Sequence, residues 1–139
     1  YRFQAREVAW PETVVAGTNA EPFRVHFAFA NAGAAQCPRD AFPCVTLKNA
    51  KGGIIAVLAD DSFNLRDLPA APPGRAEVRT HEAEFVLGRW QTPVTPPGDY
   101  EVFVSVGEAD GTPVFELPYG NADGHRRYRL GRIRIKSGK

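Results

Sequence analysis

The amino-acid sequence predicts an all-β fold: an antiparallel β-sandwich, immunoglobulin-like or jelly-roll-like, with about eight or nine short strands. The main observation is that apolar and polar residues alternate along the chain. Val25, Phe27 and Phe29 occupy every second position of one segment, and apolar residues follow the same period in residues 98–106. Clusters of Gly, Pro, Asn and Asp separate such segments, and no stretch shows a convincing helical period. The pattern therefore indicates strands with one buried face.

The individual elements follow from this pattern. In chain order, strands are expected over residues 1–7, 11–16, 23–31, 44–49, 53–59, 83–87, 98–106, 113–117 and 128–136. The connections NAKGG and EADGTP have the length of hairpin loops, so each should join adjacent antiparallel strands. DDSFNLRDLP is the stretch that favours a helical turn. No domain boundary is visible, and residues 1–139 are expected to form a single domain.

Length and charge limit the possible functions. A chain of 139 residues buries about two thirds of its unfolded surface, enough for a core. Its net charge of +1 predicts no binding to nucleic acid, and no apolar run reaches the roughly 20 residues of a membrane helix, so no membrane partner is expected. Because the chain contains no Met, we expect it to be a fragment of a larger or processed protein.

No motif predicts catalysis by this domain. The sequence has no nucleophile elbow, phosphate loop or metalloprotease helix signature. No cofactor is expected, although calcium is chemically possible because several side chains offer oxygen ligands. The alternative is that Asp60 and Asn64 cap a turn through hydrogen bonds to the backbone. The oxygen-bearing side chains in question are Asp60, Asp61, Asn64, Asp67, Glu108 and Asp110.

Two cysteines lie close together in the segment QCPRDAFPC. Cys37 and Cys44 would close one loop as a disulfide in an oxidising compartment. The alternative is two unpaired thiols. A metal site is disfavoured, since the three histidines show no ligand spacing relative to the cysteines.

A basic run ends the sequence, and period two divides it into two faces. Leu130, Ile133 and Ile135 are predicted to lie in the core, while Arg132, Arg134 and Lys136 point outward. Outward charges protect an edge strand from pairing with other chains, which is our preferred interpretation. The alternative is a binding stripe for a polyanion, more plausibly an acidic glycan than nucleic acid because aromatic residues are nearly absent from the run.

Aromatic residues beside amides indicate where a sugar would bind, since pyranose rings stack on aromatic planes while polar groups bind the hydroxyls. Trp90 and Tyr119 are the candidates; Trp10 is expected to pack in the core or between the sheets. The alternative for Trp90 and Tyr119 is burial in the core. The full set of predicted carbohydrate-binding residues is Trp90, Tyr119, Arg89, Gln91, Asn121 and Asp123.

Three segments in order resemble a known family. They are FRVHFAFANAGAAQCPRDAFPCVTLKNAKGGIIAVLADDSFNLRDLP, with its Asn-x-Gly-x-Ala turn, TPPGDYEVFVSV, and LPYGNADGHRRYRLGRIRI. The chain resembles the C-terminal β-sandwich domain-of-unknown-function 4832 family, found behind glycoside-hydrolase-like TIM barrels in secreted bacterial proteins, over roughly residues 22–136. The resemblance implies a secreted or extracellular accessory domain with the catalytic barrel elsewhere, and it assigns no ligand-binding residues.

Two functions follow from these observations. The first is a non-catalytic carbohydrate-binding module that targets a carbohydrate-active enzyme to a polysaccharide or oligosaccharide. The second is a purely structural β-sandwich that packs on an adjacent catalytic TIM barrel in the same chain and stabilises it. The structural function requires an apolar patch on one face of the domain.

Overall fold

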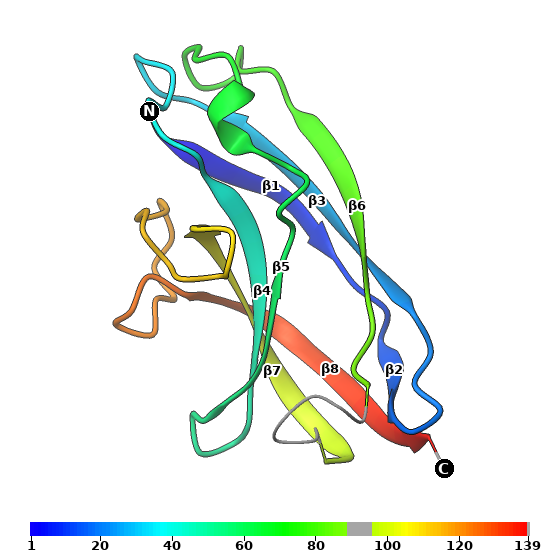
Figure 1. Cartoon of the computed structure of the whole chain (residues 1–139). Coiled ribbons are helices and arrows are strands. Elements are labelled where there is room, and N and C mark those ends of the chain that lie inside the picture. The colour runs from blue at the N-terminus through cyan, green and yellow to red at the C-terminus, as the bar shows by residue number, and fades with distance from the viewer. Residues whose placement is uncertain (89–95, 139) are drawn as a thin grey trace.

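The structure, a computed structural model, describes residues 1–88 and 96–138 and confirms the predicted all-β sandwich. Two sheets face each other, as Figure 1 shows. The described residues form eight strands: β1 (Phe3–Ala9), β2 (Thr13–Gly17), β3 (Phe23–Asn31), β4 (Phe42–Lys48), β5 (Ile54–Ala59), β6 (Arg79–Phe85), β7 (Gly98–Gly107) and β8 (Tyr128–Gly138).

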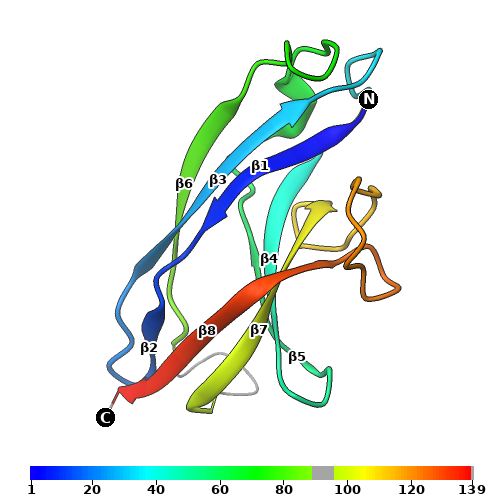
Figure 2. The same cartoon turned by 180° about the vertical axis from the view of Figure 1, so that it is seen from behind.

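The sheets have three and five strands, in the orders β1-β3-β6 and β2-β8-β7-β4-β5. All neighbouring strands are antiparallel except β2, which runs parallel to β8. Figure 2 shows that β1 lies beside β3 and that the chain then crosses to β8 as β2. Pro11 lies in the crossing segment, where its missing N–H prevents the ladder from continuing. One segment thus joins both sheets.

The core lies between the sheets and is built by the predicted alternation. Val25, Phe27 and Phe29 of β3 are all fully buried, as are Val102 and Val104 of β7. The apolar residues of both sheets form one continuous buried cluster. The hydrophobic effect on these alternating side chains therefore fixes which face of each strand points inward.

Two strand predictions need correction. The strand expected at 83–87 begins earlier, at Arg79. Its first residues are polar and show no alternation of apolar side chains, so only their pairing with β3 makes them part of the strand. Residues 113–117 form no strand. The predicted EADGTP turn is present, since Glu108 N donates to Thr112 O at 2.9 Å, but pairing ends after the single bridge between Gly107 and Pro113. NAKGG does join the antiparallel pair β4 and β5.

The expected helical turn is present as a short 3-10 helix, η1 (Leu65–Asp67). Asn64 caps it, since its side-chain oxygen accepts from Arg66 N at 3.1 Å. The Asp60 carboxylate likewise accepts from Ser62 N at 3.1 Å. Both residues therefore have the capping role that the sequence offered as the alternative to calcium ligation.

The basic run occupies an interior strand, so the prediction that it protects an edge is wrong. β8 lies between β2 and β7, and Arg132, Arg134 and Lys136 are exposed as expected. Ile133 and Ile135 are buried, but Leu130 is 41% exposed rather than in the core. A bulge in the pairing of β7 with β8 skips Leu130 and shifts the alternation before Gly131.

The predicted disulfide between Cys37 and Cys44 is absent, and both residues are buried free thiols. Cys37 belongs to the core cluster between the sheets. The Cys44 sulfur instead lies near Thr46 Oγ1, at 3.9 Å, on the outer face of β4, where Gly111 covers it. The two thiols therefore lie on opposite sides of the five-stranded sheet, which prevents a bond between them.

Cys44 should be nearly inert to alkylation in the folded protein. Burial raises the pKa of its thiol to about 11, so only about one molecule in a thousand is ionised at pH 8. We expect iodoacetamide to label Cys44 far more slowly in the native protein than in guanidinium chloride, as measured by mass spectrometry. Failure of both cysteines to react after unfolding without reductant would show that they are paired after all.

Candidate functional site

A cleft runs beside β1 where the two sheets diverge. One hollow of about 320 Å³ is lined by residues 5–8 of β1, Trp10, Tyr119, Asn121 and residues 128–130. An adjoining hollow of about 520 Å³ is lined by Arg2, residues 4–6, Gly74, Pro118 and Tyr119. Ala5, Arg6 and Tyr119 line both, and we call the two hollows together the Tyr119 cleft.

Tyr119 is held rigidly between the two hollows. Its hydroxyl accepts a hydrogen bond from Ala5 N at 2.8 Å and donates one to Ala5 O at 3.0 Å. Because β1 is an edge strand with a bulge after Ala5, its outer backbone groups need partners from outside the sheet. The ring meets Tyr128 edge-on, with centroids 6.0 Å apart, yet Tyr119 remains 39% exposed. A fixed aromatic surface thus faces solvent.

Trp10 forms another wall of the cleft and packs against the core, as expected. Its indole Nε1 donates to Arg132 O at 2.9 Å. Its ring lies over Gly131, where an added Cβ would come within 3.1 Å of the indole. Glycine at this position therefore lets the indole lie close against β8, and Trp10 serves as a wall rather than a free platform.

Polar groups surround the aromatic surface. Asn121 is exposed, and its backbone carbonyl accepts from Arg129 N at 3.0 Å. Within the described ranges, its side-chain amide makes no hydrogen bond, so it can bind a ligand. Arg129 forms a loose ion pair with Glu101 at 3.6 Å, and Arg6 is exposed without an ion pair in the same ranges. The cleft therefore offers hydrogen-bond donors on both sides of Tyr119.

Only part of the predicted site is brought together. Tyr119 and Asn121 line the cleft, but Asp123 does not, because its nearly buried carboxylate pairs with Lys48 on the outer face of the five-stranded sheet. Trp90, Arg89 and Gln91 lie outside the described residues. The sequence did not predict Arg6, Trp10 and Arg129 as residues of this site. They line the cleft only because β1 packs beside the segment that carries Tyr119 and Asn121.

A second polar pair lies far from the cleft, at the other edge of the sheets. His81 Nδ1 of β6 lies 2.5 Å from Asp60 Oδ2, and Asp60 is 3% exposed. The Phe63 ring lies 5.7 Å from the imidazole. In the described part of the chain no serine, threonine or cysteine bonds to His81, so this pair links the two sheets rather than activating a nucleophile. The same residues contain no cluster of three metal-ligating side chains.

Comparisons with known proteins find structural likeness alone. No family model matches the chain, and no curated protein matches it at a significant level. Among solved structures, the Pseudomonas fluorescens alkylpurine DNA glycosylase AlkC bound to DNA has a TM-score of 0.56 at 16% identity; the match covers 97% of this chain and 30% of that chain. It supports the sandwich fold.

Two weaker likenesses carry no argument. A β-glucosidase from Listeria innocua in complex with glucose has a TM-score of 0.49 and 14% identity, over 96% of this chain and 16% of that one. The CARDB domain of a Pyrococcus furiosus protein in complex with di-metal ions has a TM-score of 0.45 and 15% identity, over 96% and 90%. The chain thus spans less than a third of the glycosylase and the glucosidase.

The chain is therefore described as a small all-β domain with an open aromatic cleft. None of the helical segments in its described residues is long and apolar enough to cross a membrane.

Proposed function

We propose that the chain is a non-catalytic carbohydrate-binding module of a secreted glycoside-hydrolase-like protein, and that the Tyr119 cleft binds a polysaccharide. The observation that supports this function is the half-exposed Tyr119 ring, fixed between two adjoining hollows lined by polar side chains. Two hollows in series suit consecutive sugar units of a chain better than a single small ligand. The polysaccharide would carry the adjacent catalytic domain to its substrate.

Binding in the cleft would combine stacking with hydrogen bonding. The Tyr119 ring offers an apolar plane to the C–H face of a pyranose, and its fixed position removes the entropy cost of ordering it. The amide of Asn121 and the guanidinium groups of Arg6 and Arg129 would bind hydroxyls along the chain. Because the cleft is shallow and wet, we expect a dissociation constant of roughly micromolar to millimolar.

Affinity electrophoresis tests this function on xylan, glucomannan, xyloglucan, mixed-linkage glucan, pectin and cellulose. We expect retention on at least one polymer, lowered at least about tenfold by Tyr119→Ala and also by Asn121→Ala. Asn121→Ala leaves the backbone hydrogen bond of Asn121 intact, and Tyr119→Phe keeps the ring but removes the hydroxyl bonds to Ala5. Trp90→Ala belongs in the same series, since Trp90 is still a sequence-based candidate.

Tyr1→Ala is the matched control, because Tyr1 is a half-exposed tyrosine outside both hollows. It should leave retention unchanged. If Tyr119→Ala and Asn121→Ala keep full retention with the fold intact by circular dichroism, the site lies elsewhere on the domain.

The alternative is a structural β-sandwich that packs on an adjacent catalytic TIM barrel. It has some support from Ile54 and Val57 on the edge strand β5, which are 46% and 40% exposed. These two side chains contribute exposed apolar surface of the kind that packing between two domains requires. Absence of retention on every polymer would make this the preferred function.

A further inference from the structure

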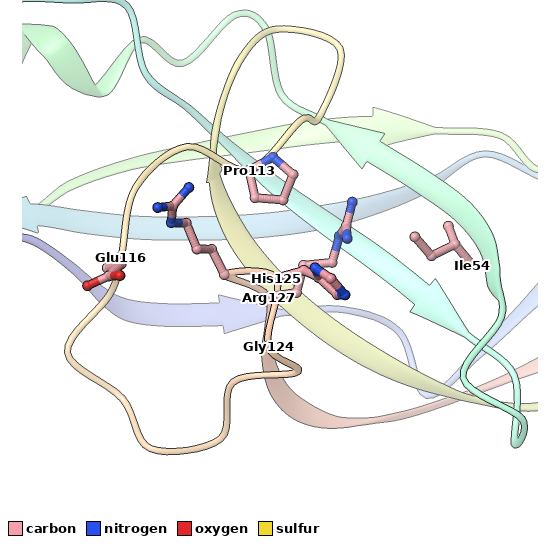
Figure 3. Close-up of a pocket in the computed structure, with 7 residues that line it drawn as sticks. Ile54, Pro113, Glu116, Gly124, His125 and Arg127 are labelled. Atoms are coloured by element: carbon pink, nitrogen blue, oxygen red, sulfur yellow. The ribbon is translucent and has the colours of Figure 1, made fainter.

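A further hollow, which shares no lining residue with the Tyr119 cleft, lies on the outer face of the five-stranded sheet. The connection from β7 to β8 folds over this face, and a pocket of about 750 Å³ forms between that connection and the start of β5. Figure 3 shows Pro113, His125 and Arg127 gathered between Glu116 on one side and Ile54 on the other. Gly124 and Arg126 complete the lining. We call it the Arg127 pocket.

The pocket has an unsatisfied cationic group. Arg127 Nε is buried and has no hydrogen-bond partner within the described residues. In the same part of the chain, no carboxylate lies within ion-pair distance of Arg126 or Arg127. Burial keeps a ligand in the pocket from reaching Nε itself, but a guanidinium group that pairs with no carboxylate leaves its charge uncompensated, and an oxyanion in the pocket would balance that charge.

The nearby carboxylate of Asp123 does not fill this role, because it is already used. It pairs with Lys48, and its Oδ1 accepts from His125 N at 2.7 Å and from Arg127 N at 3.2 Å. Asp123 N in turn donates to Arg127 O at 2.8 Å. These bonds hold the turn that carries both arginines, so the pocket is formed before any ligand arrives.

The backbone of Arg126 is consistent with this arrangement. Its φ of 62° is the only positive φ of a non-glycine residue in the described ranges. A side chain in this left-handed region is held there by its surroundings, and such residues concentrate at ligand-binding sites. The turn thus directs two consecutive arginines to the pocket wall.

The charge of the lining indicates the ligand. Two arginines against one carboxylate, Glu116, give the lining a net charge of about +1 with His125 neutral. This charge balances a monoanion better than a phosphate monoester, which carries nearly −2 at pH 7. We infer that the Arg127 pocket binds a carboxylate or sulfate ester group, as carried by acidic sugars. This inference uses none of the Tyr119 cleft residues and stands independently of the proposed function.

The test is a titration of the chain, followed by NMR chemical shifts, with galacturonate for the carboxylate and galactose 6-sulfate for the sulfate ester. The methyl ester of galacturonate is the neutral control of the same shape. We expect an anion to bind, its methyl ester to bind at least about tenfold more weakly, and affinity to fall as salt rises from about 20 to about 200 mM. The anion with the lower dissociation constant identifies the ligand type.

Variants separate this pocket from other basic sites. Arg126→Gln should weaken anion binding at least about tenfold, whereas Arg132→Gln, which changes an exposed arginine of β8 outside the pocket, should not. Arg127→Met should abolish binding while raising the midpoint of thermal unfolding, because it removes an unsatisfied buried group. Equal binding of the acid and its methyl ester, or equal effects of Arg126→Gln and Arg132→Gln, would overturn the inference.

Discussion

Asp123→Ala should lower the free energy of unfolding by about 3–5 kcal/mol, because it leaves the nearly buried Lys48 ammonium without its counter-ion. The Lys48 and Asp123 side chains are only 10% and 8% exposed. The ammonium also lies 4.6 Å from the centre of the Phe103 ring, a contact too weak to replace a carboxylate. The substitution further removes the acceptor for His125 N and Arg127 N. Urea unfolding at neutral pH measures the loss.

Two further variants isolate the ion pair. Adding Lys48→Met to Asp123→Ala should recover part of the stability, since no unpaired charge then remains buried. Asp110→Ala is the matched control, because Asp110 also accepts a backbone N–H two residues on, from Thr112 at 2.9 Å, but is exposed. It should lose much less. Equal losses for Asp123→Ala and Asp110→Ala would show that the turn, and not the ion pair, carries the stability.

The contribution of Asp123 should depend on pH. Burial by itself would raise the pKa of this carboxyl, but hydrogen bonds from Lys48, His125 N and Arg127 N, with the charge of Lys48, hold it below the ordinary value. A group with a lowered folded pKa stabilises the protein above its unfolded pKa, about 3.9 for aspartate, and loses this contribution as pH falls through the folded value. The difference between wild type and Asp123→Ala should therefore shrink in the acid range below about pH 4.

The fold was largely predictable because its signal is local. Burial of one sheet face imposes period two on the residues themselves, and the segment 23–31 coincides with β3 at both ends. Strand order is not local. The position of β8 between β2 and β7 depends on where the chain crosses after β1. The outward arginines of β8 therefore predict an edge position for this strand, whereas the structure places it inside the sheet. Leu130 is exposed for a similar reason, since a bulge depends on the partner strand.

The candidate site was predictable only where one segment supplies it. Tyr119 and Asn121 lie two residues apart and were recognised as an aromatic residue beside an amide. Their partner Ala5 lies 114 residues away in sequence, so no local pattern connects β1 to them. Asp123 belongs to the same segment but faces the other side of the sheet, where it meets Lys48. The residue types therefore indicated that this segment could bind a ligand. Only the packing of the segment against the sheet shows that Tyr119 and Asn121 face one surface and Asp123 another.

Asn31→Ala should cost about 3 kcal/mol, because one fully buried side chain makes three hydrogen bonds worth about 1 kcal/mol each. Its Oδ1 accepts from Arg2 N at 2.8 Å and from Gly33 N at 3.0 Å, and its Nδ2 donates to Ala35 O at 3.0 Å. These bonds explain the Asn-x-Gly-x-Ala turn in the sequence. They also tie β3 to the start of the chain, where an added Cβ on Gly33 would come within 2.6 Å of Arg2 N.

Asn49→Ala is the control that tests whether burial matters. The Asn49 Oδ1 also accepts two backbone N–H groups, from Lys51 at 3.0 Å and Gly53 at 2.8 Å, but in an exposed hairpin. Water replaces the lost acceptor there, so the free energy of unfolding should fall by about 1 kcal/mol or less. At Asn31 no water reaches the side-chain position, and the backbone donors stay unpaired unless the start of β1 detaches. Hydrogen exchange should then accelerate at Arg2 and Gly33 in Asn31→Ala; unchanged exchange at both amides would contradict this account.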